Sequence, residues 1–352
     1  MASETIAEAT GAEAGCVTGC AAAGISVAVA ACMTGCDLAA IGRLPDATGL
    51  RRDIVMQRGH DFSSGATAGQ IVTLPGARLV MVGDADACSA EALRQALTPD
   101  VAAALYVVGD LDVSPRLVDL PTFAATCHAD GVPVIVDAAA QHGLRSWFED
   151  GADLMIKSAQ KIHAGLTAGI IAGRLDLVRA CLLNERGVGR PMKAGKEGVV
   201  GAIAALRRWR TLDPAQQARE WARRAGAAAE CLRAVRGLDV AVVPDPLGNP
   251  FERVRVTVDP IRAGLNAWQL GAALEAGEPG IVVWAYDVAR GFILLDPRPC
   301  TDEEMALACR RIAEIVAASP ASAPAVPPPA VGDAAYFANL LAWPERPRRA
   351  TV

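Results

Sequence analysis

Short apolar runs of β type alternate with helical stretches over the first two thirds of this 352-residue chain. The alternation is typical of a mostly parallel sheet covered by helices, because each parallel strand needs a crossover before the next strand begins. In such sheets ligands gather at the carboxyl ends of the strands. The expected strands are residues 79–82, 104–108, 134–136, 154–156 and 169–172, and the expected helices between them include 89–97 and 121–129.

The pattern changes from residue 196 onward, where the chain becomes strongly helical. Asp213 and Pro214 supply a cap and a first-turn proline for a helix that runs to about residue 235. The later segments predict a small α+β domain, with strands at 240–243, 254–258, 281–284 and 292–295 and helices at 266–274 and 301–317. We expect a large domain over 1–210, a linker helix and small domain over 211–318, and a Pro- and Ala-rich tail over 319–352.

That tail contains one short segment, 336–342, with a helical pattern. Its composition leaves two outcomes open, docking on the folded body or disorder.

Composition excludes several classes of partner. Apolar residues make up 52% of the chain and the net charge is -5, which predicts a sizeable core and no general attraction to nucleic acid or anionic lipid. The most apolar early run, 21–33, is too short to span a bilayer, and acidic Glu4, Glu8 and Glu13 precede it where a secretion signal needs basic residues. We expect a cytoplasmic protein.

The ten cysteines lie mostly within apolar segments. Two pairs, Cys16/Cys20 and Cys32/Cys36, are four residues apart and would share a helical face. Metal ligands or disulfides are the alternative interpretation. Because no Cys-x-x-Cys pair accompanies them, we interpret these cysteines as small core residues and expect no metal site.

Two residues that directly follow expected strands indicate one cofactor. Asp137 ends an apolar run, and Lys161 closes a Ser-x-x-Lys turn that begins at Ser158. A lysine amine condenses with the aldehyde of pyridoxal phosphate, and a carboxylate that faces the pyridine nitrogen keeps it protonated. The pattern therefore favours pyridoxal phosphate held as a Schiff base, with Ser158 near its phosphate. The alternative is a capping Asp137 and a solvated Lys161.

Further candidates lie in the first half of the chain. Thr18, Gly19 and Cys20 precede an apolar helix, whose free N–H groups and dipole attract anions, so they are candidates for the phosphate cradle. An ordinary helix cap without a ligand is the alternative. Gln141 is a candidate for bonding the phenolic oxygen of the cofactor, and an exposed glutamine is its alternative.

A basic run, GRPMKAGKE at 189–197, lies at the start of the helical region that begins at residue 196. Its cations Arg190, Lys193 and Lys196 are suited to a phosphate or carboxylate of the substrate, with a solvated loop as the alternative. In the small domain, Arg298 is the candidate for holding a substrate carboxylate.

Together these runs resemble the fold-type I pyridoxal phosphate enzymes of the aspartate aminotransferase superfamily. Within them they resemble the family of selenocysteine synthase and D-glucosaminate-6-phosphate ammonia-lyase-like proteins, over about residues 9–317. The resemblance is carried by GAEA at 11–14, GH at 59–60, VDAAAQ at 136–141, GADL at 151–154, SAQK at 158–161 and the basic run at 189–197.

The resemblance implies a pyridoxal phosphate site and assigns its parts. Lys161 would carry the Schiff base, Asp137 would pair with the pyridine nitrogen, and His60 would stack on the ring. Thr18, Gly19 and Ser158 would lie near the phosphate. We also expect Cys20, Ala139 and Gln141 among the cofactor contacts. Members of the family work as homodimers or higher homo-oligomers with sites at subunit interfaces, so the basic run would serve a neighbouring site.

Three positions depart from the family pattern. Only about ten residues precede the GAEA run, where a longer segment is usual; SAQK followed by Ala164-Gly165-Leu166 replaces SGGK followed by Gly-Pro; and Trp284 stands where an arginine is expected. The expected activity is a lyase that eliminates ammonia or a β-substituent from an amino acid or amino-sugar acid. Alternatives are transamination, aldol cleavage or β-replacement, and a non-catalytic cofactor-binding subunit that depends on a partner protein.

Overall fold

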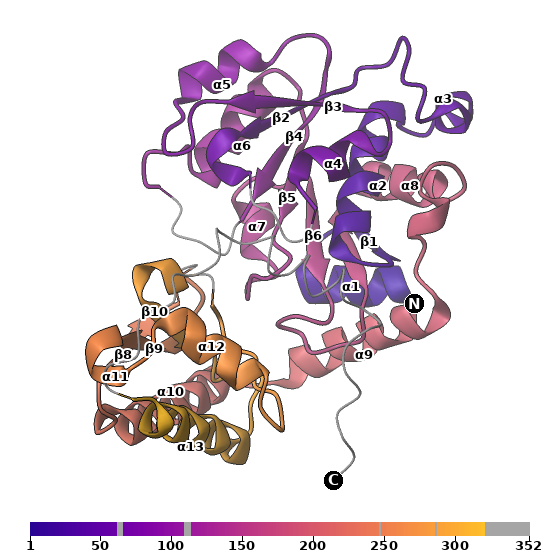
Figure 1. Cartoon of the computed structure of the whole chain (residues 1–352). Coiled ribbons are helices and arrows are strands. Elements are labelled where there is room, and N and C mark those ends of the chain that lie inside the picture. Colours follow the sequence, from indigo (N-terminus) through magenta and orange to yellow (C-terminus); the bar gives the residue numbers. More distant parts are fainter. Residues whose placement is uncertain (62–65, 109–113, 246–247, 286, 321–352) are drawn as a thin grey trace, which may run out of the picture. The chain divides into compact units, whose positions relative to one another are not determined.

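A computed structural model describes residues 1–61, 66–108, 114–245, 248–285 and 287–320. By its internal contacts the chain divides into two compact units, Met1–Leu212 and Asp213–Val352 (Figure 1). The helix predicted at 336–342, and all but the first two residues of the predicted tail, lie outside the described residues.

The first unit is built on a seven-stranded, mostly parallel sheet, which confirms the predicted fold class. Only β7 runs antiparallel to both of its neighbours among these seven strands, so β1 and β6 end at the same edge. In sheet order the strands are β1 (Ala14–Thr18), β7 (Gly169–Gly173), β6 (Leu154–Ser158), β5 (Val134–Asp137), β4 (Val101–Val107), β2 (Asp53–Gln57) and β3 (Arg78–Val82).

Helices cover both faces of this sheet (Figure 1). One core lies between the sheet and α2 (Ala21–Thr34), α4 (Ala68–Thr73) and α8 (Leu175–Asn184), and we call this side the α2 face. The second core lies between the sheet and α1 (Ala2–Thr10), α5 (Ala90–Ala96), α6 (Leu120–Ala129) and α9 (Lys196–Thr211), and we call this side the α6 face. The shorter elements are α3 (Leu38–Arg43), η1 (Arg58–His60), α7 (Ser146–Glu149) and η2 (Arg190–Met192).

Helix α2 is apolar on nearly all sides because it is enclosed on nearly all sides. It contacts the strands β4 to β7 and also the helices α4 and α8. It begins after Cys20, whose sulfur accepts a hydrogen bond from the N–H of Ala23 at 3.4 Å. None of the helices within the described residues is long and apolar enough to cross a membrane.

All five strands predicted for the first unit are present, and two further strands were missed. The sequence of β1 is AGCVT and that of β2 is DIVMQ, both fully buried. Small residues dominate β1, and polar residues at both ends of β2 leave an apolar run of only three residues, Ile54 to Met56. Neither strand therefore gives a strong strand pattern in the sequence.

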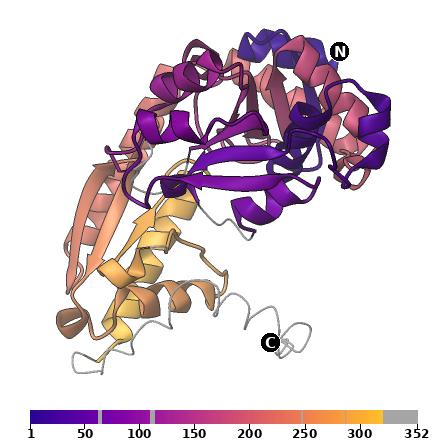
Figure 2. The same cartoon turned by 90° about the horizontal axis from the view of Figure 1, so that it is seen from above.

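The second unit contains a three-stranded antiparallel sheet in the order β10-β9-β8, with β8 and β9 drawn as adjacent arrows in Figure 2. Helix α10 packs on β8, β9 and α13, and α12 packs on α13. The elements are α10 (Pro214–Arg233), β8 (Leu238–Pro244), β9 (Glu252–Val258), α11 (Pro260–Ala263), α12 (Ala267–Glu275), η3 (Val288–Arg290), β10 (Phe292–Leu295) and α13 (Asp302–Ala318).

The prediction of a strand at 281–284 is wrong. The N–H of Ile281 donates to the carbonyl of Leu274 at the end of α12, so this segment begins by closing a helix. Only Trp284 then pairs with Leu294, as an isolated bridge at the edge of β10. Because α12 accepts the N–H of Ile281, that group is not available for the hydrogen bonds of a continuous strand.

Gly15 and Gly226 are expected to respond oppositely to alanine. A Cβ at Gly15 would lie 2.2 Å from Ile6 Cγ2 and 2.9 Å from the Ile171 carbonyl, whereas nothing lies within 4 Å at Gly226 inside α10. We predict that Gly15→Ala lowers the free energy of unfolding by about 2 kcal/mol through overpacking. Gly226→Ala is predicted to raise it by about 0.5 to 1 kcal/mol through helix propensity. Urea unfolding measures both, and changes of the same sign would contradict the packing described.

Candidate active site

The carboxyl edge of the sheet brings distant parts of the chain together at Gly169. This residue is the register partner of Thr18 on β1 and also of Ser158 on β6. The next strand along, β5, ends at Asp137, which is paired with Ile156 on β6. Thr18, Ser158 and Asp137 therefore end three strands at one edge.

The three side chains also share the α2 face. Side chains alternate along a strand, and Cys16, Ile135 and Ile156, each two residues earlier, all pack in the core under α2. Strand geometry therefore directs two hydroxyls and one carboxylate toward the side of the sheet where α2 begins. Such an edge is where ligands bind in open α/β sheets.

The start of α2 approaches this edge closely. A Cβ added to Gly169 would lie 2.2 Å from the carbonyl oxygen of Cys20 and 2.5 Å from Thr18 Oγ1. Thr18 Oγ1 itself donates to the Cys20 carbonyl at 2.9 Å. The predicted phosphate cradle of Thr18, Gly19 and Cys20 thus lies at the N-terminus of a 14-residue helix, where backbone N–H groups attract anions.

The segment after Asp137 folds back onto the neighbouring strand. The N–H of Ala139 donates to Asp137 Oδ1 at 3.1 Å, and the Ala139 carbonyl accepts from the N–H of Ser158 at 3.2 Å. Gln141 is buried, unlike the exposed glutamine considered as an alternative, and its Nε2 has no hydrogen-bond partner in the described part of the chain. A buried amide nitrogen in this state is suited to a ligand oxygen.

Lys161 lies exposed in the turn between β6 and β7. Its turn is braced by residues that depart from the family pattern: Gln160 Oε1 accepts from the N–H of Ala168 at 3.2 Å, and Ala164 adopts a positive φ of 51°. The N–H of Gly165 closes the loop on the Ala159 carbonyl at 2.8 Å. The altered turn is therefore ordered by its own hydrogen bonds and presents the lysine outward.

A second lysine, which sequence reasoning missed, lies four residues earlier. Lys157 is fully buried on β6, in line with Met155 and therefore on the α6 face. Its Nζ donates to the carbonyls of Gln141 and Gly143. Burial lowers the pKa of its ammonium group to about 7; the charge of Lys161 lowers it as well, and the Asp137 carboxylate opposes the shift. A charged residue within the apolar run LMIKS was the available signal.

His60 packs on the α6 face of the sheet, against Tyr106 of β4. Its buried ring meets Tyr106 edge-on at 4.4 Å between centroids, and Tyr106 in turn meets Phe123 of α6 at 5.3 Å. Both ring nitrogens lack a hydrogen-bond partner among the described residues, and burial lowers the pKa of the imidazole to about 4. Its stacking role on a cofactor stays a prediction.

A second buried imidazole, His163, lies two residues beyond Lys161. Its ring and that of His142 each meet Trp209 edge-on, with centroids 4.7 Å apart. Both nitrogens of His163 are buried and without a partner in the described chain. Burial, with the charge of Lys157 as the next cause, lowers the pKa of His163 to about 3.

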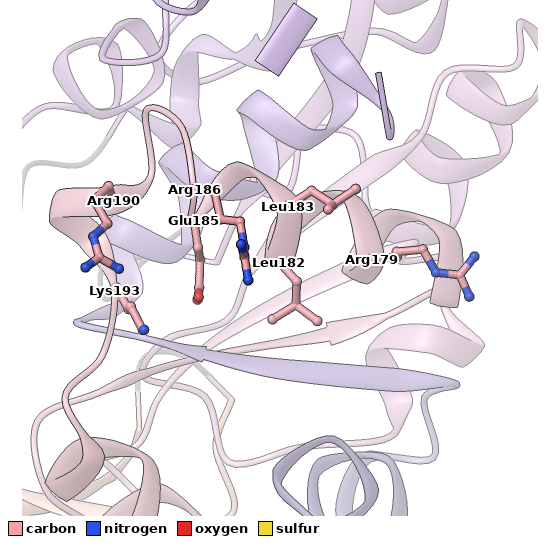
Figure 3. Close-up of a pocket in the computed structure, with 7 residues that line it drawn as sticks. All are labelled: Arg179, Leu182, Leu183, Glu185, Arg186, Arg190 and Lys193. Carbon is pink, nitrogen blue, oxygen red and sulfur yellow. The ribbon is translucent and has the colours of Figure 1, made fainter. Parts of the chain in front are cut away.

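The basic run lies beside the phosphate cradle. The N–H of Gly19 donates to the Met192 carbonyl at 2.8 Å, and Lys193 forms an isolated bridge with Thr18. Side chains of Arg190 and Lys193 line a pocket of about 750 Å³ (Figure 3). Its other lining residues, which come from α8 and its C-terminal turn, are Arg179, Leu182, Leu183, Glu185 and Arg186.

The residues that line this pocket are predominantly cationic, with Glu185 as the acid among them. Burial raises the pKa of Glu185, while Lys193 and Arg190 oppose that shift. Lys196, the third predicted cation, is exposed at the start of α9 and is not among the lining residues. The structure thus brings two of the three predicted cations together.

Arg298, predicted to hold a substrate carboxylate, lies in the second unit and already holds a carboxylate of this chain. Its guanidinium group pairs with Asp296 at 2.6 Å and lies 3.9 Å from the centre of the Phe251 ring. Buried Arg253 pairs with Asp245 at 2.6 Å and lies over Trp284, the departure from the family pattern. Trp284 therefore belongs to a network of arginines, acids and aromatic rings, and the substrate role of Arg298 stays a prediction.

The residues at the edge fit pyridoxal phosphate chemically. They include an exposed amine on Lys161, a carboxylate on Asp137, a helix N-terminus with nearby hydroxyls, and the unpaired amide nitrogen of Gln141. All ten cysteines are free. Within the described residues no group of three or more His, Cys, Asp or Glu side chains is arranged for a metal ion.

Comparison with known proteins gives relatives over most of the chain, although no family model matches it. It is 36% identical over 312 residues to D-glucosaminate-6-phosphate ammonia lyase of Salmonella typhimurium, covering 89% of this chain and 84% of that protein. It is 38% identical over 313 residues to 5'-C-glycyluridine monooxygenase-decarboxylase of a Streptomyces species, covering 88% and 78%. A solved structure of D-glucosaminate-6-phosphate ammonia-lyase superimposes with a TM-score of 0.78 at 35% identity, covering 90% and 85%.

The two buried imidazoles predict a loss of stability in acid. Because the pKa of His60 is about 4 and that of His163 about 3, the unfolded chain takes up protons below about pH 6.5 that the native protein does not bind. Each group then reduces the free energy of unfolding by about 1.4 kcal/mol per pH unit between roughly pH 6 and 4.5. Urea unfolding at several pH values across this window measures how steeply the free energy of unfolding falls with pH. In His163→Leu this slope should be smaller by the contribution of one imidazole. An unchanged slope would contradict a neutral buried His163.

Proposed function

The chain belongs to the family of fold-type I pyridoxal phosphate enzymes that includes D-glucosaminate-6-phosphate ammonia lyase, and on this premise we propose that it is a pyridoxal phosphate-dependent lyase. Its proposed substrate is an amino acid or amino-sugar acid, from which it eliminates ammonia or a β-substituent. The observation that carries the proposal is the shared sheet edge at which Asp137, Ser158 and Thr18 meet beside the Lys161 turn.

The proposed roles follow from the chemistry of the side chains. Bound pyridoxal phosphate supplies an aldehyde and an electron-accepting ring. Lys161 binds the aldehyde and then moves the proton on the carbon that bears the substrate amino group. Asp137 holds a proton at the pyridine nitrogen, and its oxygen is oriented by the Ala139 N–H. The exposure of Lys161 supports this assignment, because the amine must reach both cofactor and substrate.

Anionic groups have two proposed binding places. Thr18, Ser158 and the first N–H groups of α2 bind the cofactor phosphate. Arg190 and Lys193 bind a phosphate or carboxylate of the substrate, which their position next to Thr18 and Gly19 supports. We also propose a homodimer or higher homo-oligomer, which light scattering of the purified protein measures.

Covalent labelling identifies the cofactor lysine directly. The chain has four lysines, at 157, 161, 193 and 196. We predict that borohydride treatment of the pyridoxal phosphate-loaded protein fixes the cofactor on the peptide that carries Lys161. Lys161→Ala should abolish that adduct and lower kcat by about 10³-fold or more, because both binding and proton transfer depend on the amine.

Lys157→Met is the matched control and should keep the adduct on Lys161, because Lys157 lies buried on the other face of the sheet. An adduct that maps to Lys157, or that persists in Lys161→Ala, would refute the assignment.

The 38% identity to a monooxygenase-decarboxylase favours a second candidate, an oxygen-dependent decarboxylation on the same cofactor. The two reactions differ in what they consume. A lyase is predicted to release ammonia at the same rate with and without oxygen, whereas a monooxygenase-decarboxylase consumes oxygen and releases carbon dioxide. Assays of ammonia, oxygen and carbon dioxide with candidate amino-sugar acids and glycyl nucleosides decide between them, and turnover that stops without oxygen would contradict the lyase.

A further inference from the structure

A buried lysine, Lys157, precedes the proposed cofactor lysine, Lys161, by four residues. Only four of the 34 basic residues of the chain are lysines, and two of these, Lys157 and Lys161, are four positions apart around the end of β6. Lys157 is completely buried, and the groups that accept hydrogen bonds from its Nζ, the carbonyls of Gln141 and Gly143, are uncharged. Burying an ammonium group on neutral acceptors is unfavourable, so its charge depends strongly on its neighbours.

The two carbonyls belong to the segment that follows Asp137. Gln141 is held by Lys157 through its backbone carbonyl, while its side-chain nitrogen has no hydrogen-bond partner within the described ranges. The Gly143 carbonyl is 3.3 Å from the same Nζ and also accepts from Trp147 Nε1 at 2.8 Å. Lys157 thus connects the end of β6 to the segment that carries Asp137, Ala139 and Gln141.

The charged and titratable groups around Lys157 come from three packed elements. Asp137 ends the neighbouring strand, Lys161 and His163 lie in the turn after β6, and Arg208 of α9 donates to the His163 carbonyl at 3.2 Å. His142 faces His163 across Trp209. Both nitrogens of His163 are buried and have no hydrogen-bond partner among the described residues. An imidazole is neutral or cationic, so His163 adds no negative charge to stabilise the ammonium group. Asp137 favours the charged lysine, and Lys161 disfavours it.

We propose that Lys157 is a positioning residue that holds the segment after Asp137 in place. It binds a proton when Lys161 loses its positive charge and releases that proton when Lys161 is charged. This inference rests on the proposed function in one respect: the charge on Lys161 changes during the reaction only if that amine binds the cofactor. While Lys161 is an ammonium ion, repulsion favours the neutral Lys157 amine, which still donates two hydrogen bonds. When the charge on Lys161 is lost, Lys157 binds a proton and retains a positive charge behind the edge.

Lysine suits this role where arginine does not. A guanidinium group remains protonated at every accessible pH, whereas a buried ammonium group can release its proton near neutrality. The same buried position filled by methionine would keep the volume of the side chain and lose both the hydrogen bonds and the charge.

Nuclear magnetic resonance on the full chain, labelled with ¹³C only at the lysine ε-carbon, tests the proposal, because four lysines give at most four signals. A pH titration should show one midpoint near neutrality that disappears in Lys157→Met. In Lys161→Met this midpoint should move upward by roughly one unit, because a nearby like charge has been removed. Arg207→Gln, which removes an exposed cation from α9, is the matched control and should leave it in place.

A Lys157 midpoint at the ordinary lysine value of about 10.4, or one that Lys161→Met leaves unchanged, would overturn the proposal. Lys157→Gln tests the positioning role separately, because it keeps donors and removes the charge. In ¹⁵N-labelled protein, Lys157→Gln should retain the wild-type resonance of the Gln141 side-chain amide, whereas Lys157→Met should shift that resonance. Equal spectra for the two variants would refute the positioning role. Both measurements work on the cofactor-free chain, so their failure is distinguishable from failure to bind pyridoxal phosphate.

Discussion

The pairing of one antiparallel strand with two parallel neighbours is the constraint on which this site depends. Because β7 is hydrogen-bonded to both β1 and β6, Gly169 aligns the ends of two strands that are far apart in the sequence. Only a residue without a Cβ fits there, since the Cys20 carbonyl would be 2.2 Å from that atom. The close approach brings the start of α2 to the edge, and with it the backbone groups that can bind an anion.

A second consequence concerns electrostatics on the two faces of the sheet. The α2 face of the edge carries Asp137 and two hydroxyl groups, while the α6 face carries buried Lys157. The imidazoles of His60 and His163 are also buried on the α6 face, without hydrogen-bond partners in the part of the chain that the structure describes. Burial holds both imidazoles neutral near pH 7. Lys157 is completely buried on this face, and we propose that its charge responds to that of Lys161.

Local patterns in the sequence predicted much of this arrangement. Asp137 and Lys161 were found because apolar strand runs end just before them, and the carboxyl edge of a parallel sheet is a known place for ligands. The face on which Lys157 lies was not predicted, because it depends on the strand's register with β5 and β7. Strand β1 was missed because its small residues lack strand character, although it carries Thr18. Partners of Arg298 and Trp284 likewise come from tertiary packing that no local pattern contains.

The departures in the lysine turn are also explained by its contacts. Gln160 stands where a glycine is usual, and its side chain accepts a hydrogen bond from Ala168 across the turn. Ala164 tolerates a positive φ of 51° there. A side-chain hydrogen bond thus orders the turn where the family pattern has glycine, and Lys161 lies exposed within it.

A crystal structure of the full chain loaded with pyridoxal phosphate would show which lysine and which strand ends hold the cofactor. We predict electron density continuous with Lys161 Nζ, the pyridine nitrogen within hydrogen-bond distance of Asp137, and the phosphate at Thr18, Gly19 and Ser158. Density that joins the cofactor to Lys157, or a cofactor bound away from the edge that Gly169 aligns, would contradict it.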